Sequence, residues 1–235
     1  VIVKFANSAA AKKCKDLKSA ILQTELHITT EKYIPINQPS KVLVAYKNLD
    51  HLNFTAYKIS SKEVDKLNKM YEEAEKLAFI QSLQPIKTWQ SVLKNENDYQ
   101  NHTTETIVPN LGVGELLILA QPSTKTKTFA YATIQVTNIG FVATNTDTEQ
   151  IYQVIDRNTG IPLQDAKVKL SYKTDYNLPE KEQVSVTNAL GMIHIPKTNQ
   201  RWQNINALVT HKDDYAHFGK YYTDRSIYRP GTPVF

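Results

Sequence analysis

The densest group of chemically capable side chains in the sequence lies near its C-terminal end and consists of His211, Asp213, Asp214 and His217. Imidazole nitrogens and carboxylate oxygens bind zinc and similar metals, but only when they converge in a suitable geometry. These residues form or flank a polar turn between two strand-like runs, where such residue types are common, and their spacing imposes no ligand geometry. We therefore expect a solvated hairpin tip, and an ion bound near His211, Asp213 and Asp214 is the open alternative.

The other candidates for catalysis lack the neighbours that their chemistry requires. Cys14, the single cysteine, has no histidine nearby in the sequence to activate it, and no Gly-x-Ser-x-Gly elbow is present. Glu72 and Glu73 are adjacent, so on a helix they project in different directions and do not form an acid–base pair. Gly112 and Gly114 are followed by neither a helix nor a Lys-Ser/Thr pair, which predicts a turn instead of a phosphate loop. We expect no catalytic, cofactor-binding or metal-ligating residue, no cofactor, and therefore not an enzyme.

Composition is that of an ordinary folded chain. The 235 residues are 41% hydrophobic and 22% charged, and no apolar run is long enough to cross a bilayer. The net charge of +5 is concentrated in residues 1–24, where five Lys and one Asp give +4 and leave 5 − 4 = +1 for the rest. This distribution does not form the basic stripe of a nucleic-acid-binding protein. One cysteine also excludes a disulfide framework.

The N-terminal elements change from a helical to an alternating period. Ala10, Cys14, Leu17 and Ile21 share one face of a predicted amphipathic helix over residues 8–22, with lysines opposite and Ser8 as its N-cap. On this face Cys14 is expected to be buried and inert.

Strand-like alternation begins after residue 25. Apolar residues alternate in 42–46 and again in 52–56, and the polar turn 48–50 between them predicts a β-hairpin. Further strands are predicted at 86–93, 103–108 and 115–120.

One long helix interrupts these strands at about residues 62–83. Ser60 and Glu63 have the spacing of a capping box, an apolar stripe runs from Val64 to Phe79, and Pro85 closes the segment.

The polar, proline-containing stretch 121–127 is the best internal boundary. Beyond it, strands recur at the spacing typical of a β-sandwich. They are predicted at 132–139, 141–145, 150–155, 167–172, 183–186, 192–195, 205–210 and 215–221. We expect hairpin loops at 188–191 and 211–214.

These elements predict a mainly β chain of two tandem Ig-like antiparallel β-sandwiches. The predicted parts are a leader with a short helix (1–24), a sandwich with a helical insertion (25–122), a second sandwich (128–222) and a linker into a further domain (223–235). The residues at both ends of the chain suggest a fragment of something longer.

Three stretches together resemble bacterial alpha-2-macroglobulin-like proteins. The first is Asp156-Arg-Asn-Thr-Gly-Ile-Pro-Leu-Gln-Asp-Ala-Lys-Val-Lys-Leu170 with the turn at 188–191, which is similar to a strand-turn-strand of their macroglobulin-like domains. The second and most specific is Thr223-Asp-Arg-Ser-Ile-Tyr-Arg-Pro-Gly-Thr-Pro-Val-Phe235, which resembles the linker into the next such domain. The third comprises 87–93, 98–105 and 109–114, which together resemble the second half of the domain just upstream. Residues 11–17 resemble the joint before that upstream domain.

The resemblance implies macroglobulin-like domains from a large protease trap of the bacterial cell envelope, periplasmic or anchored as a lipoprotein. In such proteins a protease cleaves a bait segment, the body collapses around it, and many members carry a Cys-Gly-Glu-Gln thioester. This sequence contains neither that motif nor a recognisable bait region. The chain would therefore be a non-catalytic scaffold that meets proteases through the full-length protein and contacts neighbouring domains of the same chain.

A tandem Ig-like adhesion or glycan-binding module is the alternative. Thirteen tyrosines on a sandwich could provide a surface for stacking carbohydrate. On strands, however, tyrosines more commonly pack against cross-strand neighbours.

Overall fold

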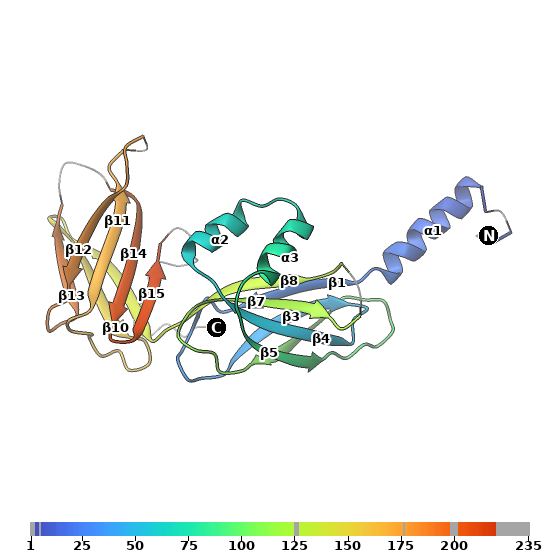
Figure 1. Cartoon of the computed structure of the whole chain (residues 1–235), viewed down its shortest axis with the longest axis horizontal. Coiled ribbons are helices and arrows are strands. Elements are labelled where there is room, and N and C mark those ends of the chain that lie inside the picture. Colours follow the sequence, from blue (N-terminus) through green and yellow to red (C-terminus); the bar gives the residue numbers. More distant parts are fainter. Residues whose placement is uncertain (1–2, 5, 125–126, 176, 198–201, 220–235) are drawn as a thin grey trace. The chain divides into compact units, whose positions relative to one another are not determined.

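The computed structural model of the chain is mainly β, with three helices and fifteen strands among the described residues (Figure 1). The structure describes residues 3–4, 6–124, 127–175, 177–197 and 202–219. The segment 223–235, predicted to be a linker, lies outside the described residues. None of the helices in the described ranges is both long and apolar enough to span a membrane.

The chain divides into two compact units. The first unit contains Val1–Glu31, Pro39–Asn110 and Glu115–Ile134, and the second contains Lys32–Gln38, Leu111–Gly114 and Gln135–Phe235. These ranges differ from the sequence-based ranges 25–122 and 128–222, which remain predictions of domain extent. Two short segments of the first half, Lys32–Gln38 and Leu111–Gly114, belong to the second unit. This assignment depends on contacts between residues distant in the sequence, which local composition does not reveal.

Helix α1 (Ala9–Leu22) begins as predicted, because the Ser8 Oγ accepts a hydrogen bond from the Ala11 N–H at 3.0 Å. The expectation that Cys14 is buried is wrong, because this residue is exposed. Ala11 is the buried residue of α1, and it lies off the stripe that contains Cys14. The apolar face of α1 is therefore exposed to solvent.

The first unit contains a three-stranded sheet of order β1-β3-β6 and most of a five-stranded sheet of order β2-β8-β7-β4-β5. The strands are β1 (Glu25–Thr30), β2 (Tyr33–Ile34), β3 (Ser40–Lys47), β4 (His51–Lys58), β5 (Pro85–Val92), β6 (His102–Val108), β7 (Gly114–Pro122) and β8 (Ala130–Val136). Strand β2 pairs in parallel with the last two residues of β8, and both of these segments belong to the second unit.

The alternating burial predicted for β3 and β4 is confirmed, but the predicted hairpin between them is wrong. Burial alternates with position in both strands, at 42, 44 and 46 and at 52, 54 and 56, as expected from the period. Tyr57, at the end of β4, is buried as well. However, β3 pairs with β1 and β6, whereas β4 pairs with β5 and β7. The turn at Asn48 (φ 55°) and the buried Leu49 thus carry the chain from one sheet to the other. Period-two alternation gives the buried face of a strand but not its partner.

The helical insertion consists of two short helices instead of the predicted single one. These are α2 (Ser61–Asn68) and α3 (Glu73–Gln81), separated by an extended residue at Glu72 (ψ 122°). The predicted capping box at Ser60 and Glu63 is present. The break lets both helices pack apolar side chains on β7. The shared cluster contains Val64, Leu67, Ile80, Leu83, Leu117 and Leu119.

The second unit has two antiparallel sheets, of order β13-β10-β9 and β12-β11-β14-β15. Its strands are β9 (Ile139–Asn145), β10 (Glu149–Asp156), β11 (Lys167–Lys173), β12 (Lys181–Val186), β13 (Met192–Pro196), β14 (Gln203–His211) and β15 (Asp214–Phe218). Its core includes Tyr152, Val154, Val168, Leu170, Ile193 and Val209. Both sheets contribute buried side chains to this core, which fits the predicted sandwich.

One of the two predicted hairpins of this unit is confirmed. Strands β14 and β15 pair directly across the turn at 211–214. In contrast, residues 188–191 do not join a hairpin, since β12 pairs with β11 and β13 pairs with β10. Gly191 (φ 68°) makes this crossing possible, because a Cβ at this position would lie 2.4 Å from the Val154 carbonyl oxygen.

Candidate functional site

The His211–His217 segment does not form a ligand cluster. Asp214 pairs with His211 across the turn, and its Oδ2 accepts a hydrogen bond from the Asn138 N–H at 2.8 Å. Burial raises the pKa of the Asp214 carboxyl above its ordinary value. Among the residues that the structure describes, no group of three His, Cys, Asp or Glu side chains could hold a metal ion. Asp214 therefore serves as an anchor for the backbone at the start of β9.

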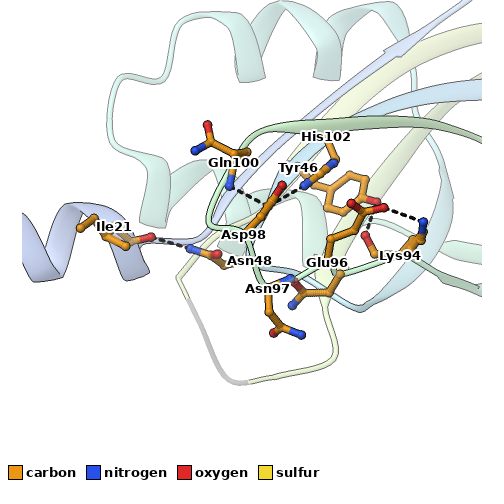
Figure 2. A network of polar contacts seen from close by, with 10 residues as sticks. Ile21, Tyr46, Asn48, Lys94, Glu96, Asn97, Asp98, Gln100 and His102 are labelled. Atoms are coloured by element: carbon orange, nitrogen blue, oxygen red, sulfur yellow. Dashed lines mark hydrogen bonds and ion pairs between the residues drawn. The ribbon is translucent and has the colours of Figure 1, made fainter.

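A second polar cluster, which the sequence did not point to, fixes the loop of residues 93–101 to the ends of β3 and β6. His102 Nε2 lies 2.9 Å from Asp98 Oδ1, and the Tyr46 hydroxyl donates to the Lys94 carbonyl oxygen at 2.8 Å. Figure 2 shows Tyr46, Asp98 and His102 close together, with Glu96 reaching Lys94. We call these five residues the loop clamp.

The electrostatics of the loop clamp favour a fixed loop over reactivity. The Gln100 N–H and then the His102 ring lower the pKa of Asp98, because both stabilise the carboxylate. Burial raises the pKa of the Tyr46 phenol, so this group stays protonated near neutral pH. The Asp98 carboxylate is already engaged by two donors, and the phenol donates to the backbone. The arrangement therefore acts as a structural clamp. Asp98 and His102 lie four residues apart between a loop and the start of β6, and this spacing gave no signal for the clamp in the sequence.

A third cluster joins α1 to the first unit. Asn48 Nδ2 donates to the carbonyl oxygens of Ile21 (2.8 Å) and Gln23 (3.0 Å), and Lys47 Nζ donates to that of Ala20 at 3.1 Å. The last carbonyls of a helix have no partner within the helix, so side chains from elsewhere can cap them. Figure 2 shows Asn48 directed at Ile21. This helix cap fixes the C-terminal end of α1, and the turn at 48–50 was recognised from the sequence only as a turn.

In the second unit a buried amide completes the edge of a sheet. Gln135 is 1% exposed, its Nε2 donates to the His217 carbonyl oxygen, and its Oε1 accepts from the His217 N–H, both at 2.7 Å. The Tyr33 hydroxyl donates to the same carbonyl at 3.2 Å. The side chain therefore occupies the place of a neighbouring strand beside β15, which is the last strand of its sheet among the described residues. We call this arrangement the edge seal.

Stacked rings connect the two sheets of the second unit. Phe141 of β9 stacks on Tyr152 at 5.1 Å and on Phe218 at 5.2 Å, and Phe218 stacks on Tyr33 at 5.4 Å. The Arg157 guanidinium lies 5.6 Å from the Tyr33 ring. Two of these tyrosines are thus used in packing, as the sequence interpretation expected for tyrosines on strands.

Comparison with known proteins finds similarity only at the level of structure. No protein-family model matches the sequence, and no curated protein is significantly similar to it. Native alpha-2-macroglobulin from Escherichia coli, in a crystal structure spanning domains MG0-NIE-MG1, is similar with a TM-score of 0.59 at 10% identity. The match covers 84% of this chain and 64% of that one, so this chain matches less than two thirds of its length.

A shorter crystal structure of the same E. coli protein, spanning NIE-MG1, matches with a TM-score of 0.54 at 10% identity. Here 84% of this chain and 97% of the other are covered. A tetra-tandem repeat from the extending region of a large adhesion protein gives a TM-score of only 0.30 at 10% identity. The match covers 84% of this chain and 49% of that one, and its TM-score is too low to indicate a shared fold. At such low identity these similarities establish the fold alone, and that fold is the macroglobulin-like one expected from the sequence.

Proposed function

We propose that this chain is a non-catalytic scaffold of an alpha-2-macroglobulin-like protease trap in the bacterial cell envelope. The observation that carries the proposal is the match over 84% of the chain to two structures of bacterial alpha-2-macroglobulin. A match of this extent includes residues of both units, whereas a single generic sandwich would match only one. Proteases are the proposed partners of the full-length protein, and neighbouring domains are the proposed partners of this segment.

The use of polar side chains supports a scaffold role. The loop clamp, the helix cap and the edge seal each use a side chain to bind the main chain of a loop, a helix end or a strand edge. The remaining contacts of the loop clamp join side chains within the same unit. An enzyme, in contrast, needs titratable groups that converge on a space for substrate. Rigid domains of this kind are suited to holding the neighbouring domains of a larger protein in fixed positions.

The adhesion and glycan-binding alternative has less support. Tyr33 and Tyr152 stack inside the second unit, and Tyr46 is 3% exposed. Tyr71 (91% exposed) and Tyr99 (48%) are far more accessible, but neither has a stacked aromatic neighbour among the described residues. We therefore do not put this function forward.

The test uses the full-length protein that contains this segment. It is incubated with a broad-specificity protease, and cleavage of a folded protein substrate is compared with cleavage of a short chromogenic peptide. A trap blocks cleavage of the large substrate and spares the small one, whereas the isolated 235-residue segment leaves both unchanged. Full cleavage of both substrates in the presence of the full-length protein would refute the proposal, and cell fractionation would test the envelope location.

A further inference from the structure

Three buried polar atoms of the first unit have no hydrogen-bond partner among the described residues. They are the Ser40 hydroxyl of β3, the Trp89 indole nitrogen of β5 and the Thr106 hydroxyl of β6. Thr106 is only 7% exposed. A buried polar group normally binds a protein or water partner, because leaving it unpaired costs free energy. One partner can serve all three groups only if they lie close together.

Ser40 and Thr106 lie on the same face of one sheet. In the pairing of β3 with β6, Ser40 is opposite Val108 and Thr106 is opposite Val42. Val42 is completely buried, and residues two positions apart on a strand share a face, so both hydroxyls lie on the inner face of the sheet. Diagonal neighbours of this kind are about 7–8 Å apart. The two hydroxyls do not bind each other, but a small molecule between them can reach both.

Trp89 lies on the inner face of the other sheet. It is opposite Phe54 in the pairing of β4 with β5, and the two rings stack with their centroids 5.2 Å apart. Phe54 is completely buried. Helices α2 and α3 cover the opposite face of this sheet, where they pack on Leu117 and Leu119 of β7. Phe54 and Trp89 therefore face the β1-β3-β6 sheet.

Two hydrogen bonds fix the level of β5 along β6. At one end, the Lys94 carbonyl oxygen accepts from the tyrosine of the loop clamp, which pairs with the first residue of β6. At the other end, Lys87 Nζ donates at 3.1 Å to the carbonyl oxygen of Asn110, just beyond β6. The two strands therefore run in opposite directions. Counting inward from either end places Trp89 at the level of residues 106–108, which is the level of the two hydroxyls.

One water molecule satisfies all three groups. Its oxygen can accept from the indole N–H, which only donates, and its two hydrogens can bind the two hydroxyl oxygens. None of the three groups is charged, which disfavours an ion in the same place. We propose that Ser40, Trp89 and Thr106 bind a structural water inside the first unit, and that this water joins β5 of one sheet to β3 and β6 of the other. This inference does not depend on the proposed scaffold function.

Tyr152 in the second unit shows why a single unpaired group is not enough for such a site. Its hydroxyl also lacks a partner among the described residues, but the residue packs in a cluster of apolar side chains. A buried water needs about two to four polar partners, so one hydroxyl cannot hold it. The site in the first unit meets this requirement with three.

A high-resolution crystal structure of the whole chain tests the site directly. We expect one water at about 2.7–3.2 Å from Ser40 Oγ, Trp89 Nε1 and Thr106 Oγ1. Thr106→Val keeps the shape of the side chain but removes one of the three partners, so the water should be lost in this variant. Thr104→Val makes the same change two residues away on β6 and should leave the water in place.

Urea denaturation gives an independent measurement. In a Trp202→Phe background, the fluorescence of Trp89 reports the unfolding of the first unit. If the water is bound, Thr106→Val should lower the midpoint more than Thr104→Val does, because the water and the other two groups lose a partner. If no water is bound, the same variant only removes an unpaired hydroxyl and should raise the midpoint. Circular dichroism checks that each variant is folded.

Either measurement can overturn the proposal. In the crystal structure of the wild type, the absence of density between the three groups, or a water bound to fewer than three of them, would remove the site. Direct hydrogen bonds among the three side chains would do the same. In the denaturation experiment, a midpoint that Thr106→Val raises or leaves unchanged would show that its hydroxyl has no bound partner.

Discussion

Replacing Gln135 by leucine tests whether a side-chain amide completes the edge of β15. The change leaves the volume nearly unchanged but removes both hydrogen bonds to His217. The His217 N–H then loses the Gln135 acceptor, while its carbonyl oxygen still accepts from the Tyr33 hydroxyl at 3.2 Å. A buried group left without a partner costs about 1–3 kcal/mol, and His217 is only partly buried. We therefore expect the free energy of unfolding of the second unit to fall by about 1–2 kcal/mol.

The two tryptophans allow the two units to be followed separately. Trp89 belongs to the first unit, and Trp202, stacked on Tyr172 at 3.6 Å, belongs to the second. In a Trp89→Phe background, the tryptophan fluorescence during urea denaturation reports the second unit alone. With a slope of about 1–2 kcal/mol per M urea, the expected loss moves the midpoint by about 0.5–2 M.

Gln153→Leu is the matched control for this prediction. It makes the same substitution in the same unit, but the amide it removes donates one exposed hydrogen bond, to the Leu190 carbonyl at 3.0 Å. We expect a cost of less than about 0.5 kcal/mol. If Gln135→Leu costs no more than this control, the edge seal does not stabilise the unit and the reasoning is wrong.

Three further changes address other parts of the fold. Gly191→Ala should destabilise the second unit by about 3 kcal/mol in the same denaturation assay, because φ is 68° and the new Cβ would meet the Val154 carbonyl at 2.4 Å. Tyr152→Phe should change stability by less than about 0.5 kcal/mol at neutral pH, because no described residue is within hydrogen-bond distance of its hydroxyl. Burial raises the pKa of Tyr152 to about 12, so the folded state favours the protonated phenol. The wild type should therefore lose stability relative to this variant as the pH rises from 10 to 12. Asn48→Ala should speed amide hydrogen exchange in the last turn of α1 while leaving the strands of the first unit unchanged, because it removes two hydrogen bonds to that helix end.

For each of these three variants, one outcome would contradict the prediction. A Gly191→Ala protein as stable as wild type would mean that the crossing loop can shift away from β10. A loss of more than about 1 kcal/mol in Tyr152→Phe at neutral pH would indicate a hydrogen bond to the hydroxyl. Uniformly faster exchange throughout the first unit in Asn48→Ala would show that the residue stabilises the whole unit instead of one helix end.

The sequence predicted burial within elements better than it predicted contacts between them. Alternation in 42–46 and 52–56 identified the buried side chains of β3 and β4, because neighbouring side chains of a strand point to opposite faces. The same pattern could not choose a partner strand, so the hairpin across 48–50 was wrong. The break between α2 and α3 was also missed, since the apolar spacing continues through it and only packing on β7 favours two short helices.

The polar clusters were harder to predict for a related physical reason. Each joins residues distant in sequence, such as Gln135 with His217 or Asn48 with Ile21, and depends on an atom-to-atom distance that no local period reports. A buried glutamine within an otherwise apolar strand was the available signal for the edge seal, because a buried amide needs partners.

The exposure of Cys14 shows that helical periodicity can also predict burial where there is none. The period of α1 correctly gave an amphipathic helix, and the usual inference from such a helix is that its apolar face packs against the rest of the domain. This inference fails because the C-terminal end of the helix is fixed through its last carbonyls, while Cys14, Leu17 and Ile21 stay exposed. Leu17 (63% exposed) and Ile21 (40% exposed) therefore add little to the core of the first unit, although the period of the helix places them on its apolar face.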